Sequence, residues 1–103
     1  MEDTTKHTVS IIGLGLIGGS FALGLRKSGF ASKLIGVEQH PDHAAKALEL
    51  GLVDIVLPLN EALAQSDLIV AATPVDTLMH LLPAILDQLQ PHQTVIDAGS
   101  TKA

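Results

Sequence analysis

Short apolar runs alternate along the chain with longer stretches in which apolar residues recur at three- and four-residue spacings. The runs lie at 8–14, 33–38, 54–57, 67–73 and 94–98. The first run is rich in valine and isoleucine and has no polar alternation, as expected for a parallel strand buried on both faces. The pattern therefore predicts five strands, with the first in the middle of the sheet.

The stretch after the first run predicts a helix over about residues 16–28. Ile17, Phe21 and Leu25 are four positions apart, so they share one face of such a helix. Two basic residues at the end of the stretch suit the negative end of a helix, and Gly29 follows as a stop signal.

A second helix is predicted between the second and third strands. Residues 44–50 are good helix formers, and Gly51 ends them. Pro41 suits the first turn of this helix, because proline has no amide hydrogen to leave unpaired there. Gln39 or His40 then lies near the cap.

Two more helices are predicted in the second half of the chain. A short one covers 60–65, with Asn60 as a plausible cap. A longer stretch, 75–89, has a single apolar face. Pro83 interrupts it and disfavours helical geometry at Leu82, so we expect a kink or two short helices in tandem.

Strands that alternate with helices over short loops predict an α/β fold with a parallel sheet, right-handed crossovers and helices on both faces. We expect the Rossmann-type, doubly wound strand order 3-2-1-4-5. Its ligand crevice lies at the carboxyl ends of the strands, where the order reverses between the first strand and the fourth.

The 103 residues suffice for one domain and are too few for two. Residues 1–103 are thus interpreted as a single dinucleotide-binding domain.

Composition narrows the range of partners. The chain has 11 acidic residues against 6 basic ones and no dense basic run, which argues against nucleic acid or an anionic membrane surface as a partner. No apolar run is long enough to span a bilayer. The absence of cysteine excludes disulfides, thiolate metal sites and thiol catalysis. The N-terminus lacks the basic and apolar regions of a signal peptide, so a cytoplasmic location is expected.

A glycine-rich motif, GLGLIG, joins the first strand to the first helix. In a dinucleotide-binding fingerprint, Gly13 permits the tight turn, Gly15 lets the backbone approach a pyrophosphate, and Gly18 lets the helix pack closely on the strand. The alternative is a merely structural turn between strand and helix. The expected cofactor-binding residues of this loop are Gly13, Leu14, Gly15, Leu16, Ile17 and Gly18.

Glu38 ends the second strand, twenty positions after Gly18. This spacing matches an acid that accepts hydrogen bonds from the adenosine ribose, and it favours NAD over NADP. A 2′-phosphate would meet the carboxylate, and Gln39 and His40 offer no arginine to neutralise it. His40 could add a weak contact near the adenosine. The alternative is that Glu38 is a solvated residue entering a loop.

Thr73 and Pro74 follow the fourth strand, where the chain must leave room for a dinucleotide. Proline fixes this turn, and the threonine offers a hydroxyl and a carbonyl. A helix start, with Thr73 as cap and Pro74 as first residue, explains the pair equally well. We expect both residues to contact the cofactor.

The run at 97–102, Asp-Ala-Gly-Ser-Thr-Lys, ends the fifth strand with small residues that can approach the nicotinamide side of the crevice. The alternative is an ordinary turn after a strand. The five histidines form no convergent set with metal-ligand spacing, so we expect no metal site.

These motifs together resemble the N-terminal domain of the prephenate and arogenate dehydrogenases of tyrosine biosynthesis, a branch of aromatic amino acid biosynthesis. The resemblance rests on GLGLIGGS from Gly13, on Thr73-Pro74-Val75, and on the run at 97–102. It implies an oxidoreductase that decarboxylates prephenate to 4-hydroxyphenylpyruvate, or arogenate to tyrosine, and passes hydride to NAD or NADP. It also implies that Ser100 is the active-site serine.

The family's remaining features lie beyond the matching region. Its members continue into a strand bearing a Gly-x-His-Pro motif and then into a helical domain that dimerises and supplies arginines for the substrate carboxylates. We therefore expect this chain to bind NAD but not to turn over prephenate alone, because the general base would be missing. We also expect a homodimer, since an uncovered sheet edge favours association.

Two other interpretations stay open. The chain could be the cofactor domain of another two-domain enzyme, such as a 3-hydroxyacid dehydrogenase or an imine reductase. It could also be a non-catalytic NAD-binding module. The run at 97–102 favours the prephenate group over the other enzymes, and the binding module stays open.

Overall fold

The computed structural model describes residues 7–98, without the side chains of Leu16, Ile17 and Val75. Strands and helices alternate along this part of the chain. In order they are β1 (His7–Ile12), α1 (Leu16–Ser28), β2 (Ala31–Val37), α2 (Pro41–Glu49), β3 (Ile55–Val56), α3 (Leu59–Gln65), β4 (Leu68–Ala71), α4 (Val75–Gln88) and β5 (Thr94–Asp97).

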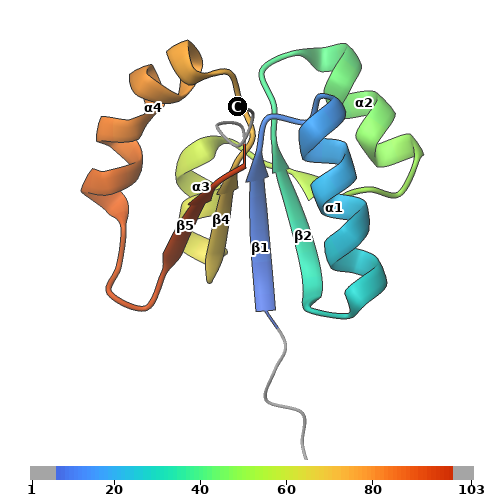
Figure 1. Ribbon diagram of the computed structural model, residues 1–103, viewed down its shortest axis with the longest axis horizontal. Helices are drawn as coiled ribbons and strands as arrows, with labels where there is room; N and C mark the ends of the chain where they lie inside the picture. The colour runs from blue at the N-terminus through green and yellow to red at the C-terminus, as the bar shows by residue number, and fades with distance from the viewer. Residues whose placement is uncertain (1–6, 99–103) are drawn as a thin grey trace, which may run out of the picture.

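The five strands form one parallel sheet in the order β3-β2-β1-β4-β5. β1 lies in the middle, where Ile12 pairs with Val37 of β2 on one side and with Ala71 of β4 on the other. The labelled strands all point the same way in Figure 1, so their carboxyl ends meet at one edge of the sheet. The predicted fold class and strand order are confirmed.

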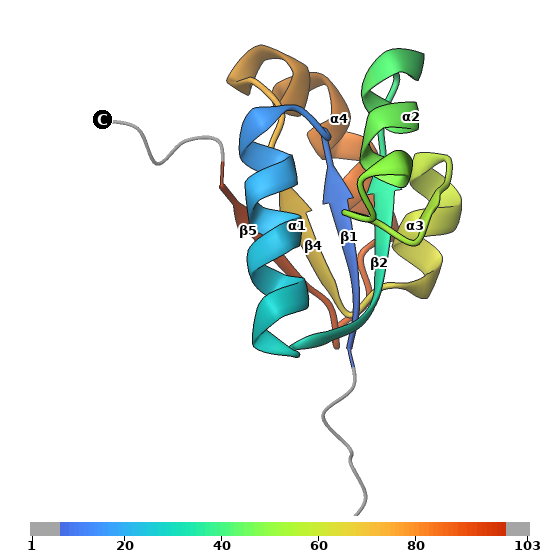
Figure 2. The same ribbon diagram turned by 90° about the vertical axis from the view of Figure 1, so that its right-hand side faces the viewer.

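Two apolar cores cover the two faces of the sheet. Because successive side chains of a strand point to opposite faces, Val9 and Ile11 of β1 join one core and Ile12 joins the other. The first core includes Ala22 of α1 and Ala47 of α2, and the second includes side chains of α3 and α4. In both Figure 1 and Figure 2, α1 and α4 lie on opposite sides of the strands.

The ends of the first two helices follow local sequence signals. α1 is closed by Gly29, whose φ of 79° is in the left-handed region that glycine adopts at little cost. α2 begins at Pro41 with His40 as its N-cap. Both boundaries agree with the sequence-based expectation.

Of the two outcomes expected at Pro83, a kink or two short helices in tandem, α4 rules out the second. The helix runs unbroken over Val75–Gln88, with Pro83 inside it. Proline removes one backbone hydrogen bond at this point. However, Leu78 and Ile85 are buried on either side of it and Leu82 packs against the same core, so apolar burial holds the helix together.

The N-caps of two other helices differ from the sequence-based expectation, by two residues in α3 and by one in α4. α3 begins at Leu59 with Pro58 as its N-cap, so Asn60 is not the cap. The Asn60 side chain instead accepts a hydrogen bond of 2.9 Å from the Gln88 amide. α4 begins after Pro74, so Thr73 is not its cap either.

None of the helices within residues 7–98 is both long and apolar enough to cross a bilayer.

Candidate functional site

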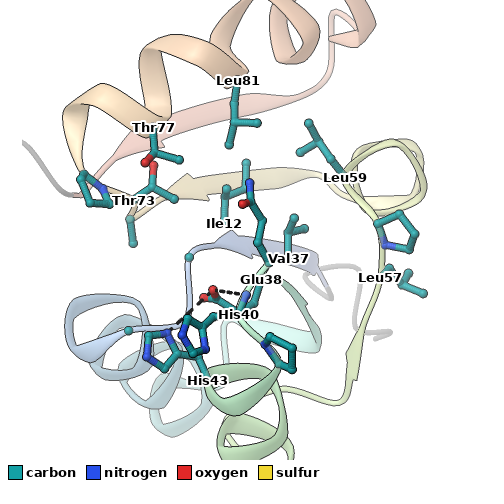
Figure 3. A pocket seen from close by; sticks show the side chains of 17 residues that line it. Ile12, Val37, Glu38, His40, His43, Leu57, Leu59, Thr73, Thr77 and Leu81 are labelled. Atoms are coloured by element: carbon teal, nitrogen blue, oxygen red, sulfur yellow. Dashed lines mark hydrogen bonds and ion pairs between the residues drawn. The ribbon is translucent and has the colours of Figure 1, made fainter.

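A pocket of about 720 Å³ opens at the carboxyl ends of the strands. Its floor comes from Ile12 at the end of β1, Val37 at the end of β2 and Ala72 after β4. β1 is the strand at which the order of the sheet reverses, and parallel α/β sheets place their ligands at this point. Figure 3 shows the pocket between two walls that come from different elements.

The glycine loop forms one rim of the pocket. Gly13 has a φ of 95°, which only glycine adopts readily, and its amide donates a hydrogen bond of 2.8 Å to Val37 O. A Cβ on Gly13 would lie 2.8 Å from the methyl group of Thr73. Glycine at this position therefore satisfies both the turn and the close approach of the chain after β4.

Gly15 and Gly18 differ in their surroundings. A Cβ on Gly18 would lie 1.9 Å from the Gly13 carbonyl oxygen, so α1 can contact the loop this closely only with glycine there. At Gly15, a Cβ would meet nothing within 4 Å. Gly15 is also the N-cap of α1. Because glycine has no side chain that could cap the helix, the first backbone amides of α1 are left for another acceptor.

Glu38 lies between the loop and α2. One carboxylate oxygen accepts a hydrogen bond of 2.5 Å from the Leu14 amide, and the other accepts one of 2.9 Å from the His40 amide. The Glu38 side chain is 11% exposed. A solvated loop residue would be far more accessible, so Glu38 is part of the structure of the site.

Two histidines, one at the N-cap of α2 and one in its first turn, continue the same wall. The rings of His40 and His43 stack with their centroids 4.5 Å apart. His43 Nδ1 lies 3.8 Å from the second carboxylate oxygen of Glu38, and the two form an ion pair when the imidazole is protonated. Figure 3 places Glu38 and both histidines together on one side of the pocket.

The opposite wall comes from the β4–α4 turn and the first turns of α4. Thr73, Thr77 and Leu81 line it, and Figure 3 shows them facing the Glu38 side. The Thr73 hydroxyl is buried, and within the described part of the chain it has no hydrogen-bond partner. Buried hydroxyls normally have a partner, so this oxygen is a candidate ligand contact.

These features fit a dinucleotide laid across the crevice. The open space at Gly15 admits a group against the backbone, and the amides at the start of α1 suit a phosphate. Glu38 keeps free lone pairs for a ribose hydroxyl, because each carboxylate oxygen can accept two hydrogen bonds. The unpaired Thr73 hydroxyl supplies a further polar contact.

The structure brings five of the ten predicted site residues together in the pocket. Gly13, Gly15, Glu38, Thr73 and Pro74 all line the pocket. Three others of the set are placed differently. Leu14 reaches Glu38 through its amide, Gly18 is buried behind the loop, and Leu16 is the first residue of α1.

Two members of the predicted set cannot be placed in the pocket. The Ile17 side chain and all of Ser100 lie outside what the structure describes, so their expected roles stay predictions. Within residues 7–98, no three histidine, aspartate or glutamate side chains are arranged so that they could hold a metal ion.

Sequence reasoning missed several residues that line the pocket. Leu57 and Pro58 come from the loop after β3, and Leu59 is the first residue of α3. Thr77 and Leu81 come from α4. A helical spacing of four from Thr73 would have found the two residues of α4. No sequence signal distinguishes the β3 loop, because only the folded sheet brings it beside β2.

The chain matches the family model described as the nucleotide-binding domain of prephenate dehydrogenase over residues 21–103. It is 34% identical over 103 residues to the prephenate dehydrogenase of Bacillus subtilis strain 168, covering 94% of this chain. Among solved structures, it is similar to prephenate dehydrogenase from A. aeolicus in complex with hydroxyphenyl propionate and NAD+, with a TM-score of 0.83, 34% identity and 93% of this chain covered. It is also similar to Synechocystis arogenate dehydrogenase, with a TM-score of 0.77, 33% identity and 87% of this chain covered.

These relatives are much longer than the matching region. The alignments cover 27% of the Bacillus subtilis protein, 34% of the A. aeolicus chain and 32% of the Synechocystis chain.

Proposed function

Because the chain belongs to the prephenate dehydrogenase nucleotide-binding domain family, we propose that its pocket binds the NAD of such an enzyme and prefers NAD to NADP. The observation that carries the proposal is the placement of Glu38. It is 11% exposed at the end of β2, beside the glycine loop and facing the pocket. A carboxylate in this position accepts hydrogen bonds from ribose hydroxyls and repels a 2′-phosphate.

Each group of the site then has a role in binding. The backbone at Gly15 and the start of α1 receive the pyrophosphate, and Glu38 holds the adenosine ribose. Thr73 and Pro74 define the turn beside the nicotinamide half, where the Thr73 hydroxyl donates or accepts one hydrogen bond. Bound NAD supplies the hydride acceptor. By the family resemblance, Ser100 is the active-site serine next to it.

We propose that the complete enzyme acts in the cytoplasm on prephenate or arogenate in tyrosine biosynthesis, as a homodimer. The 103-residue polypeptide alone should bind the cofactor without turning over the substrate. Arg26 is its single arginine, and it pairs with Asp54 at 3.2 Å, away from the pocket. No guanidinium is therefore available there for the substrate carboxylates. An assay of prephenate-dependent NADH formation by this polypeptide should match the protein-free control.

Calorimetric titration with NAD and NADP tests the binding proposal. Native chain should bind NAD more tightly, by at least about tenfold, because a like charge beside the 2′-phosphate costs on the order of 1 kcal/mol or more. Glu38→Gln should weaken NAD binding and narrow the difference between the two dinucleotides.

Glu61→Gln is the matched control, because it removes the same charge from an exposed position on α3 that does not line the pocket. It should leave both affinities unchanged. Equal binding of NAD and NADP by the native chain would contradict the preference, and no binding of either would contradict the proposed function itself.

A further inference from the structure

The Glu38 wall of the pocket contains an unusual group of titratable side chains. Glu38, His40 and His43 are the titratable groups among the described residues that line the pocket. The two imidazole rings stack with an interplanar angle of 19°, and His43 Nδ1 lies 3.8 Å from the Glu38 carboxylate. His43 is 51% exposed, so it can exchange protons with solvent.

Other charged groups near this wall are few. On α2 itself, Asp42 is exposed, and Lys46 lines a neighbouring pocket together with His43. The loops that follow β1, β3 and β4 contribute no charged side chain to the lining. Asp76, in the first turn of α4, is exposed and does not line the pocket. The net charge of the wall therefore depends on Glu38 and the two imidazoles.

This charge depends on whether the imidazoles carry a proton, and histidine side chains in general change charge between about pH 5 and pH 8. With both imidazoles neutral, the wall carries the single negative charge of Glu38, which opposes the 2′-phosphate of NADP. Protonation of His43 places a positive charge next to that carboxylate. The imidazolium cancels the charge of Glu38 and can also donate a hydrogen bond to a phosphate oxygen.

We propose that His43 is a specificity-determining residue for the dinucleotide: its protonation weakens the exclusion of the 2′-phosphate by Glu38. The inference rests on the proposed NAD site and deepens it. NAD has hydroxyls where NADP has its phosphate, so its affinity should change much less with protonation.

The test is the ratio of the Kd for NADP to the Kd for NAD, measured by calorimetry on the native chain at about pH 8 and about pH 5.5, across the range of histidine titration. The ratio should fall by about tenfold at the lower pH, because the added positive charge attracts the 2′-phosphate. Low ionic strength keeps the charge effect unscreened.

The 2′-phosphate of NADP itself takes up a proton near about pH 6. Two substitutions at His43 distinguish the effect of this proton from the effect of protonating His43. His43→Gln keeps a polar side chain but cannot become charged, so its ratio should fall by less than about threefold, from the phosphate alone. His43→Lys carries a charge throughout, so its ratio should already be low at about pH 8 and change little. His92→Gln, an exposed position outside the pocket, should behave as the native chain.

The outcomes distinguish this inference from the proposed function. If NAD binds and His43→Gln retains the full pH dependence, His43 does not determine specificity and the inference is overturned. If His43→Lys fails to improve NADP binding at about pH 8, the charge mechanism is overturned as well. If the native chain binds neither dinucleotide, the proposed function fails and the inference fails with it. Thermal unfolding of each variant verifies that it is folded.

Discussion

Glu38 combines a structural role with its proposed binding role. Its two carboxylate oxygens accept the amides of Leu14 and His40, so the side chain ties the glycine loop to the start of α2. Hydrogen bonds to an ionised acceptor are among the stronger ones in proteins. The sequence spacing suggested only a ribose contact, whereas the structure adds that the same carboxylate fixes the geometry of the loop.

Thr73 illustrates how a residue of the binding site can lower the free energy of unfolding. Its hydroxyl is buried without a partner among the described residues, and such a group costs on the order of 1–3 kcal/mol. Thr73→Val keeps the shape and removes the hydroxyl. We expect the variant to unfold at an equal or higher urea concentration and to bind NAD more weakly, by about fivefold to tenfold, as for one lost hydrogen bond.

Thr73→Ser is the matched variant, because it retains the hydroxyl and deletes the methyl group that lies against Gly13. It should bind NAD nearly as well as the native chain. Unchanged NAD affinity in Thr73→Val would mean that the hydroxyl makes no contact with the cofactor.

At the scale of elements, the contact between α1 and the glycine loop depends on the absence of one side chain. A Cβ at Gly18 would lie 1.9 Å from a backbone oxygen, which no rotamer change can relieve. We expect Gly18→Ala to lower the free energy of unfolding by at least about 2 kcal/mol, as for overpacking, and to weaken NAD binding by displacing the loop. Urea unfolding and calorimetry measure the two effects.

Gly24→Ala, in the same helix, is the control. A Cβ at Gly24 would meet nothing within 4 Å, so alanine should stabilise the helix by about 0.5–1 kcal/mol through its better helix propensity. Similar effects of the two substitutions would contradict the role of Gly18 in packing.

α3 is attached to the rest of the fold by buried polar contacts. Gln93 lies just before β5. Its side-chain Nε2 donates hydrogen bonds of 2.6 Å to the carbonyl oxygens of Leu63 and Ser66 at the end of α3. The hydroxyls of Ser10 and Ser66 form a further hydrogen bond beneath the helix. The two bonds from Gln93 thus go to carbonyls at the end of a helix, where the regular helical hydrogen bonds run out. No pattern in the sequence indicates these hydrogen bonds, because the partners are far apart along the chain.

At the scale of the whole molecule, the two edges of the sheet differ. β3 has two residues at one edge, whereas β5 has four at the other, and the described residues place no further strand beside β5. Ile96 of β5 is 40% exposed. An open strand edge with exposed apolar side chains favours association.

We expect the chain to form a dimer through β5, measured as a doubled mass by light scattering at high protein concentration. Ile96→Lys should shift the equilibrium toward monomer, because charge on an edge strand opposes pairing. Leu86→Lys is a control at another exposed apolar position, on α4. A monomer mass for the native chain at all concentrations would refute the association.

The sequence by itself determined the order of elements, the strand order and the identity of the glycine loop. These features follow from local periodicity, from cap residues such as Gly29, and from the few topologies that parallel strands allow. The comparisons with known relatives confirmed the family that the loop, the Thr73-Pro74 turn and the run at 97–102 had indicated.

Only the tertiary structure decided how the pocket is built. α4 continues past Pro83 because its apolar side chains are buried against the sheet, although proline locally disfavours a helix. The β3 loop enters the site because β3 pairs with β2, and His43 reaches Glu38 because α2 turns back beside the strand end. Such contacts join residues through packing and strand pairing, and no local pattern in the sequence specifies them.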